Sequence, residues 1–193
     1  MGTTDLLGGD LEAAVRTLLA EIGEDPSRDG LAGTPERVRR MYSELTAGYQ
    51  ADPDRLINGA CFEVDYDEMV VVRDIEFFSL CEHHLLPFYG RAHVGYLPRG
   101  RVIGLSKIPR IVDMYAHRLQ VQERLTVQVA DFLMERLEPK GVGCVVEASH
   151  LCTMMRGVRK QQATMVTSSM LGRFRQDAKT RGEFLTFIGR SSE

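Results

Sequence analysis

The sequence has no long apolar run, and this absence excludes a whole class of protein. No stretch approaches the roughly 18 consecutive apolar residues of a membrane helix, and the opening MGTTDLLGGD lacks the basic and apolar regions of a signal peptide. We therefore expect a cytoplasmic protein with no membrane partner. The chain of 193 residues is about one domain long and has enough apolar sequence to bury a sizeable core.

The sequence also lacks a basic excess and the common phosphate-binding loops. Its formal net charge is -3, from 24 Lys and Arg against 27 Asp and Glu, which argues against a nucleic-acid partner. Neither G-x-x-x-x-G-K-[ST] nor G-x-G-x-x-G occurs, and there is no internal repeat. The charges of any polyanionic ligand therefore have to be met by a local cluster of cations.

Two helices are expected near the N-terminus. Apolar residues recur with the helical period over 11–22, and Gly23 is a natural stop. A second helix is expected to begin with Thr34 as its cap and Pro35 at its first position. We interpret residues 1–50 as a helical arm and residues 51–193 as the main domain, entered through an irregular connection.

The main domain has a pattern typical of an α+β layer fold. Strands are expected over 69–78, 91–97, 142–152 and 162–167, helices over 106–115 and 121–137, and 102–105 is expected to extend the first hairpin. Thr180 and Glu183 form a capping box for a last helix. The core order ββααββ predicts an antiparallel sheet with helices on one face. Self-association would cover the other face.

Cysteine is scarce, and two of the four cysteines stand close to histidines. In a reducing compartment, metal binding or burial is their expected use. The C-x-x-H spacing of Cys81 and His84 suits a turn in which both side chains reach one metal ion. Cys152 follows His150 by two residues, and on a predicted strand the two share a face.

Cys152 would complete a Cys2His set with one position left for water, the pattern of a catalytic zinc ion. Spacing alone does not distinguish this site from a damaged structural zinc site. We interpret Cys144 as a core residue, because eight residues of strand, roughly 26 Å, separate it from Cys152. Burial is the preferred interpretation for Cys61 also.

Four separated motifs, CEHHLLPF, GLSKIPRIV, LQVQERLT and HLCTMMRG, resemble those of GTP cyclohydrolase I in sequence and in order. The resemblance runs from the helix at Thr34 to EFLTFI near the C-terminus. It implies the tunnelling fold and a homodecamer of two pentamers with active sites between subunits. In that family a zinc-activated water attacks C8 of GTP, formate leaves, and the product is 7,8-dihydroneopterin triphosphate, the first step of pterin and tetrahydrofolate biosynthesis.

The resemblance also implies a role for each site residue. The zinc ligands are Cys81, His84 and Cys152, and the proton-transferring residues are His83 and His150. The substrate-binding residues are Glu82, Ser106, Lys107, Arg110, Gln122, Glu123 and Arg156. Within this set Gln122 and Glu123 recognise the pyrimidine edge of guanine, the basic residues with Ser106 bind the triphosphate, and the role of Glu82 is left open.

Alternatives to these roles come from the residues themselves. A carboxylate suits the N1-H and 2-amino donors of guanine, yet without the resemblance an acid at a helix start is the preferred explanation of Glu123. The basic residues could form a solvated face. A zinc-dependent deaminase would need H-x-E and P-C-x-x-C, and neither occurs. A non-catalytic member with structural zinc is the other alternative, and the presence of both His83 and His150 argues against it.

Overall fold

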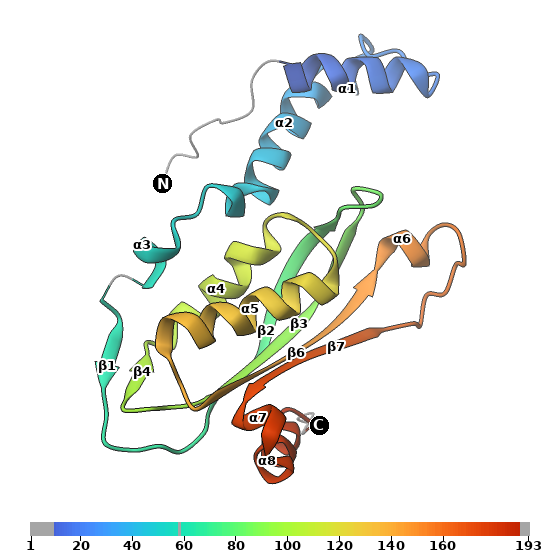
Figure 1. Ribbon diagram of the computed structural model, residues 1–193. Coiled ribbons are helices and arrows are strands. Elements are labelled where there is room, and N and C mark those ends of the chain that lie inside the picture. Colours follow the sequence, from blue (N-terminus) through green and yellow to red (C-terminus); the bar gives the residue numbers. More distant parts are fainter. Residues whose placement is uncertain (1–9, 58, 190–193) are drawn as a thin grey trace. The chain divides into compact units, whose positions relative to one another are not determined.

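The structure is a computed structural model that describes residues 10–57 and 59–189 (Figure 1). The chain divides into two compact units, Met1–Ala47 and Gly48–Glu193. Within the described residues, no helix has the length and apolar character that a membrane crossing requires. The division into an arm of residues 1–50 and a domain of residues 51–193 stays a prediction.

The first unit contains helices α1 (Asp10–Glu21) and α2 (Thr34–Leu45). They pack together, and Arg39 on α2 donates to Glu12 on α1 at 2.9 Å. Gly23 has φ +90°, a left-handed conformation that ends α1 as the sequence predicted. The prediction of Thr34 as a cap was wrong by one residue, since the helix begins at Thr34 and the capping position is Gly33, which has no side chain to bond.

The second unit is built on a five-stranded sheet in the order β5-β2-β3-β6-β7. Its strands are β2 (Val70–Cys81), β3 (Pro87–Leu97), β5 (Leu119–Gln120), β6 (Gly141–His150) and β7 (Met165–Gly172). All neighbours run antiparallel except the short β5 beside β2. The ββααββ order and the α+β prediction are confirmed.

The connection into this sheet has more structure than the sequence suggested. It contains the 3-10 helix η1 (Ala47–Tyr49), helix α3 (Pro53–Ile57) and strand β1 (Cys61–Glu63). Strand β4 (Arg101–Ile103) pairs with β1 in a separate two-stranded sheet. The prediction that residues 102–105 extend the first hairpin was therefore wrong, because a short upstream strand is the partner that β4 takes.

Helices α4 (Lys107–Ala116) and α5 (Gln122–Leu137) cover one face of the five-stranded sheet (Figure 1). Ile111 on α4, Leu133 on α5 and Val94 on β3 are fully buried in the core between these layers. Cys144 lies in the same core with no exposed surface, which confirms the interpretation of this cysteine. Burial raises the pKa of its thiol to about 12, so it stays protonated.

The C-terminal helices α7 (Arg173–Gln176) and α8 (Ala178–Gly189) cover one end of the opposite face. Their fully buried Phe174 and Phe184 meet edge to face at 5.4 Å and pack against Val145, whose side chain points away from α5. The sheet approaches these rings closely at Gly143. These helices add a second, partial layer to the predicted single layer.

The cap of α8 is Asp177, so the predicted capping box of Thr180 and Glu183 was wrong. Asp177 accepts from the backbone N-H groups of Lys179 at 3.1 Å and Thr180 at 3.3 Å. Its other hydrogen bond comes from the Thr180 hydroxyl, and these donors hold the pKa of the Asp177 carboxyl below its usual value. An aspartate three residues before the threonine was the stronger capping group.

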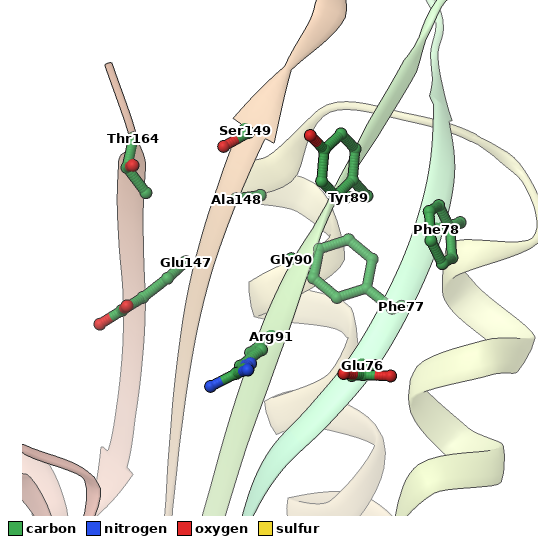
Figure 2. A pocket seen from close by; sticks show the side chains of 10 residues that line it. All are labelled: Glu76, Phe77, Phe78, Tyr89, Gly90, Arg91, Glu147, Ala148, Ser149 and Thr164. Carbon is green, nitrogen blue, oxygen red and sulfur yellow. The ribbon is translucent and has the colours of Figure 1, made fainter. Parts of the chain in front are cut away.

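The rest of the opposite face is open on this chain. Phe78 and Tyr89 stack at 5.6 Å, and 60% of Phe78 is exposed. Arg91 stands across the strands from Glu76 on one side and Glu147 on the other. Figure 2 shows these charged and aromatic side chains lining a hollow over the middle of the sheet.

The contact of the sheet with α7 and α8 predicts a site-specific cost for a single methyl group. An added Cβ at Gly143 would lie 2.6 Å and 2.9 Å from ring atoms of Phe174 and 3.0 Å from Phe184. Gly143→Ala is therefore expected to lower the free energy of unfolding by about 1–3 kcal/mol through overpacking. Urea denaturation followed by circular dichroism measures the change.

Gly182→Ala is the matched control for this prediction. Gly182 lies inside α8 with nothing within 4 Å of an added Cβ. Alanine is the better helix former there, so this variant is expected to be neutral or more stable by up to about 1 kcal/mol. Equal unfolding midpoints for the two variants would contradict the packing of α7 and α8 on the sheet.

Candidate metal centre and active site

The register of the sheet brings the candidate site residues to one end. Ser79 near the end of β2 pairs with Phe88 at the start of β3, and Phe88 pairs with His150 at the end of β6. Cys81 pairs with Gln120 of β5, two residues before α5 begins. The CEHH stretch, the end of β6 and the first turn of α5 therefore meet at one end of the sheet.

Cys81, His84 and Cys152 form the group that could hold a metal ion. One potential ligand atom from each residue lies within 4.8 Å of the other two. A tight turn after β2 places the first two, because the Cys81 carbonyl accepts from Leu85 N at 2.8 Å and from His84 N at 3.4 Å. Leu85 has φ +55°, which reverses the chain into β3.

The strand assigned to Cys152 was wrong. β6 ends at His150, and Cys152 lies in the following helical turn, α6 (Leu151–Met154). His150 and Cys152 therefore reach the same end of the sheet because of the turn and not because they alternate along a strand. The preferred interpretation of Cys61 as a buried residue agrees with its place on β1, partly buried against the core.

The donor set fits zinc. A zinc ion about 2.0–2.3 Å from thiolate sulfur and imidazole nitrogen needs these atoms roughly 3.5–3.8 Å apart, so the separation of at most 4.8 Å closes with small side-chain rotations. Burial raises the pKa of the Cys152 thiol, and the neighbouring Cys81 adds to this effect. A metal cation in this place would favour both thiolates.

His150 stands beside the metal group in a fixed orientation. Its ring lies parallel to that of Phe88, with an interplanar angle of 1° and centroids 4.7 Å apart. Its Nε2 lies 2.8 Å from Oε1 of Gln122. Burial lowers the pKa of His150, and the carboxylate of Glu123 opposes that shift.

His83 and Arg156 also lie next to the metal group. The Nδ1 atom of His83 is 3.8 Å from Cys81 Sγ. Arg156, expected at the triphosphate, donates to Nε2 of His84 at 2.6 Å. Glu123 is exposed in the first turn of α5 and close enough to affect His150 electrostatically. The structure thus brings four further predicted residues next to the metal group or His150, and these are His83, Gln122, Glu123 and Arg156.

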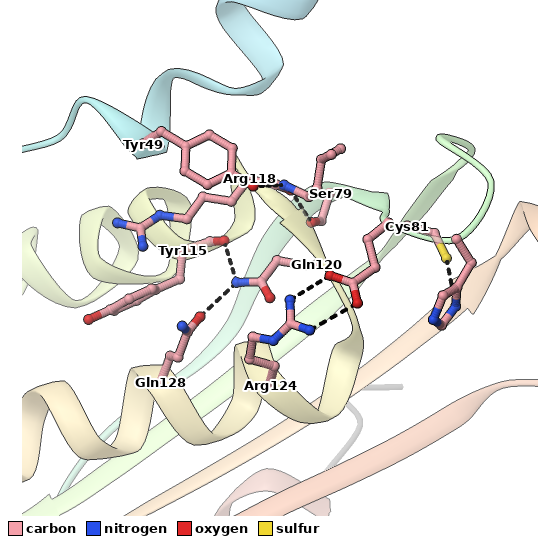
Figure 3. A network of polar contacts seen from close by, with 11 residues as sticks. Tyr49, Ser79, Cys81, Tyr115, Arg118, Gln120, Arg124 and Gln128 are labelled. Atoms are coloured by element: carbon pink, nitrogen blue, oxygen red, sulfur yellow. Dashed lines mark hydrogen bonds and ion pairs between the residues drawn. The ribbon is translucent and has the colours of Figure 1, made fainter.

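Glu82 joins the CEHH turn to α5. Its carboxylate accepts from both terminal nitrogens of Arg124, at 2.6 Å and 2.9 Å, and its N-H donates to Gln120 O at 3.0 Å. The bonds from Arg124 hold the pKa of Glu82 below its usual value. Figure 3 shows Arg124 and Gln120 within this polar network.

The residues Ser106, Lys107 and Arg110, which the resemblance assigns to the triphosphate, lie at or near the start of α4. Ser79 Oγ donates to Ala116 O at 2.7 Å, which holds the end of α4 near the metal group. Lys107 begins the same helix, roughly 15 Å away at 1.5 Å per residue, and its Nζ donates to Leu56 O at 2.8 Å. Ser106 and Arg110 flank it. One chain therefore places Ser106 and Lys107 a helix length from the metal group, and Arg110 stands between them, about 9 Å from Ala116 along the helix.

Sequence reasoning missed two residues of this site. Arg124 lies inside the quoted LQVQERLT motif, but its charge alone did not indicate a partner 42 positions away. Phe88 lies inside CEHHLLPF, and only the pairing of β3 with β6 places it under His150. Both partnerships depend on contacts that are distant in the sequence.

The fold and the site define a tunnelling-fold protein with a candidate metal centre of the zinc type at one end of its sheet. A family comparison agrees with this class, since the sequence model of GTP cyclohydrolase I matches residues 11–189. The chain belongs to the GTP cyclohydrolase I family.

Individual relatives are similar over nearly the whole chain. GTP cyclohydrolase 1 of Leptospira biflexa is 59% identical over 92% of this chain and 97% of its own length. GTP cyclohydrolase 1 of Methylococcus capsulatus is 58% identical over 93% and 97% respectively. Among solved structures, the archaeosine synthase QueF-Like in its apo form has a TM-score of 0.48 at 18% identity, over 56% of this chain and 97% of that chain.

Cys152→Ser tests the metal group directly. A neutral hydroxyl is a poor substitute for a thiolate ligand, so the variant is expected to lose most of the zinc that the parent retains on dialysis. Atomic absorption after dialysis measures the zinc content. Cys61→Ser removes a cysteine outside the group and is expected to retain zinc like the parent. Full zinc content in Cys152→Ser would exclude Cys152 as a ligand.

Proposed function

We propose that this chain converts GTP to 7,8-dihydroneopterin triphosphate with release of formate, in a zinc-dependent reaction. The observation that carries the proposal is the Cys81, His84 and Cys152 group beside a partly buried histidine, His150, in a chain of the GTP cyclohydrolase I family. The reaction would be the first step of pterin and tetrahydrofolate biosynthesis. We propose the cytoplasm as its location.

The zinc ion would be held by Cys81, His84 and Cys152. When bound, it would supply hydroxide at neutral pH by lowering the pKa of a water molecule to about 7. The buried Cys81 and the turn that follows it fix the two ligands of the CEHH stretch. The bidentate pair of Glu82 with Arg124 supports this turn from α5, so we assign Glu82 a supporting role in the site.

His150 and His83 are the proposed proton-transfer groups. Opening of the purine ring requires a proton at N7, and opening of the ribose requires one at its ring oxygen, work suited to histidine. Burial lowers the pKa of His150, so at neutral pH its ring is mainly uncharged and able to accept a proton. His83, close to Cys81, would serve the other position.

Glu123 is the proposed reader of guanine. Its side chain is exposed in the first turn of α5, beside His150, where a ligand can reach it. A carboxylate accepts from both N1-H and the 2-amino group of guanine, donors that adenine does not present together. Recognition of the base would thus lie within reach of the proton-transfer group.

We further propose that the active site is completed by a neighbouring copy of this chain, in a decamer of two pentamers. Within one chain Ser106 and Lys107 stand a helix length away from the metal group, and Arg110 lies on the same helix between them and the metal group. A second copy could bring its basic residues to the triphosphate. The sheet has edges for such pairing, since β7 is an outer strand and β5 covers only Leu80 and Cys81 of β2. Light scattering would measure the mass of the assembly.

Incubation of the purified, zinc-loaded protein with GTP tests the proposed reaction. The expected result is one formate per GTP and a fluorescent pterin after oxidation. His150→Ala is expected to retain zinc and to slow turnover by roughly a hundredfold or more. Release of ammonia instead would indicate a deaminase, and no product from zinc-loaded protein would indicate a non-catalytic member of the family.

Glu123→Gln tests the reading of guanine. The amide keeps the shape of the side chain but loses its charge and places an N-H donor against donors of the base. Since hydrogen bonds to charged groups contribute about 1.5–3 kcal/mol, kcat/KM for GTP should fall roughly ten- to 150-fold. Steady-state kinetics with GTP and inosine triphosphate measure the effect.

Zinc content is the control for this variant and should equal that of the parent. Preference for GTP over inosine triphosphate, which lacks the 2-amino group, should shrink. If Glu123→Gln keeps both the rate and the preference, guanine is read elsewhere and Glu123 acts only as an acid at the helix start.

A further inference from the structure

Gln122 has a buried side chain, although the family resemblance implies contact with guanine. Only 1% of the residue is exposed. Its amide nitrogen donates to Val146 O at 2.9 Å, to Met165 O at 3.0 Å and to Thr167 Oγ1 at 3.2 Å. The side chain is therefore held between the start of α5 and strands β6 and β7, and the donors of its amide already have partners in the protein.

These donor bonds fix the direction of the amide. Backbone carbonyls can only accept, so the NH2 group has to face Val146 and Met165, and a flipped amide would place its oxygen against their oxygens. The amide oxygen then faces His150, 2.8 Å from Nε2. Because that oxygen can only accept, the Nε2 atom of His150 carries the proton in this contact.

A neutral histidine has a single ring proton, so the contact with Gln122 leaves Nδ1 as the acceptor atom. Among the described residues, Nδ1 of His150 has no hydrogen-bond partner. The parallel contact with Phe88 fixes the plane of the same ring. Gln122 and Phe88 together thus determine which ring nitrogen is available and where it lies.

A second hydrogen-bonded chain holds Gln122 in place. Thr126 Oγ1 donates to the backbone carbonyl of Gln122 at 2.8 Å and lies 2.6 Å from Thr167 Oγ1, which in turn accepts from the Gln122 amide. Both threonines hold the first turn of α5 against β7. A side chain with this many fixed contacts is suited to orienting a neighbour rather than to adapting to a ligand.

We propose that Gln122 is a positioning residue that holds the His150 ring with Nε2 protonated and Nδ1 turned to the reaction, and that it does not read guanine. The proposal rests on the proposed function, in which His150 transfers a proton. It separates the two neighbouring residues of α5 into different roles: Glu123 would bind the base, and Gln122 would act through His150.

A double-mutant cycle tests this proposal. Gln122→Met keeps the length of the side chain and removes the acceptor together with the amide donors to Val146, Met165 and Thr167. It is expected to lower kcat roughly ten- to 100-fold, the scale for removing a group that orients a functional histidine, with KM for GTP and zinc content unchanged. In the His150→Ala background the same substitution should cost less than about twofold, because its target is gone.

The opposite pattern would overturn the proposal. If Gln122 reads guanine, Gln122→Met raises KM and costs the same factor in both backgrounds. Gln128→Met is the matched control, since Gln128 lies on the same helix and its oxygen accepts from Gln120 at 2.7 Å instead of from a histidine. This control is expected to keep kcat and KM close to those of the parent.

A second variant and a second measurement cover the case in which Gln122→Met folds poorly. Gln122→Glu retains an acceptor oxygen near His150, and its second oxygen, which faces the carbonyls of Val146 and Met165, has to carry a proton to stay there. This variant is expected to keep more of kcat than Gln122→Met; equal kcat values would count against the proposal. In 15N-histidine-labelled parent protein, the His150 nitrogens should show the Nε2-H form, and a mixture of tautomers would overturn the proposal. A parent that releases no formate refutes the proposed function, whereas an active parent with equal costs in both backgrounds refutes the role of Gln122 alone.

Discussion

The pairing of Phe88 with Ser79 on one side and His150 on the other is the contact on which the candidate site depends. Antiparallel pairing places the end of β2, the start of β3 and the end of β6 at the same end of the sheet. Because side chains alternate along a strand, a shift of one residue in this register would turn Phe88 and His150 to different faces. The metal group and the stacked histidine would then separate.

The strand register also sets the partners of the polar residues between α5 and this end of the sheet. A buried amide is costly unless its donors and acceptor have partners, and Gln122 finds them on β6, on β7 and at His150. Glu82 and Arg124 join the same helix to the CEHH turn by a bidentate ion pair. The start of α5 is thus attached both to the turn with two metal-ligand candidates and to the proton-transfer candidate.

The two faces of the sheet differ in how completely a single chain covers them. Helices α4 and α5 bury one face, whereas α7 and α8 cover only one end of the other. Aromatic and charged side chains, among them Phe78 and Arg91, stay open beyond that end (Figure 2). The proposed assembly of several copies would explain three features of the single chain. These are the open face of the sheet, its open edges and the distance of the basic residues of α4 from the metal group.

The sequence by itself determined the order of the core elements, the burial of Cys144 and the choice of Cys81 with His84, because periodicity and short spacings are local properties. Tertiary structure decided the rest. The helical turn that carries Cys152, the choice of Asp177 over nearby candidates as a cap and the direction of the Gln122 amide all depend on contacts between segments far apart in the chain or on competition between neighbouring groups. Single-residue patterns do not contain the strand register that sets these contacts.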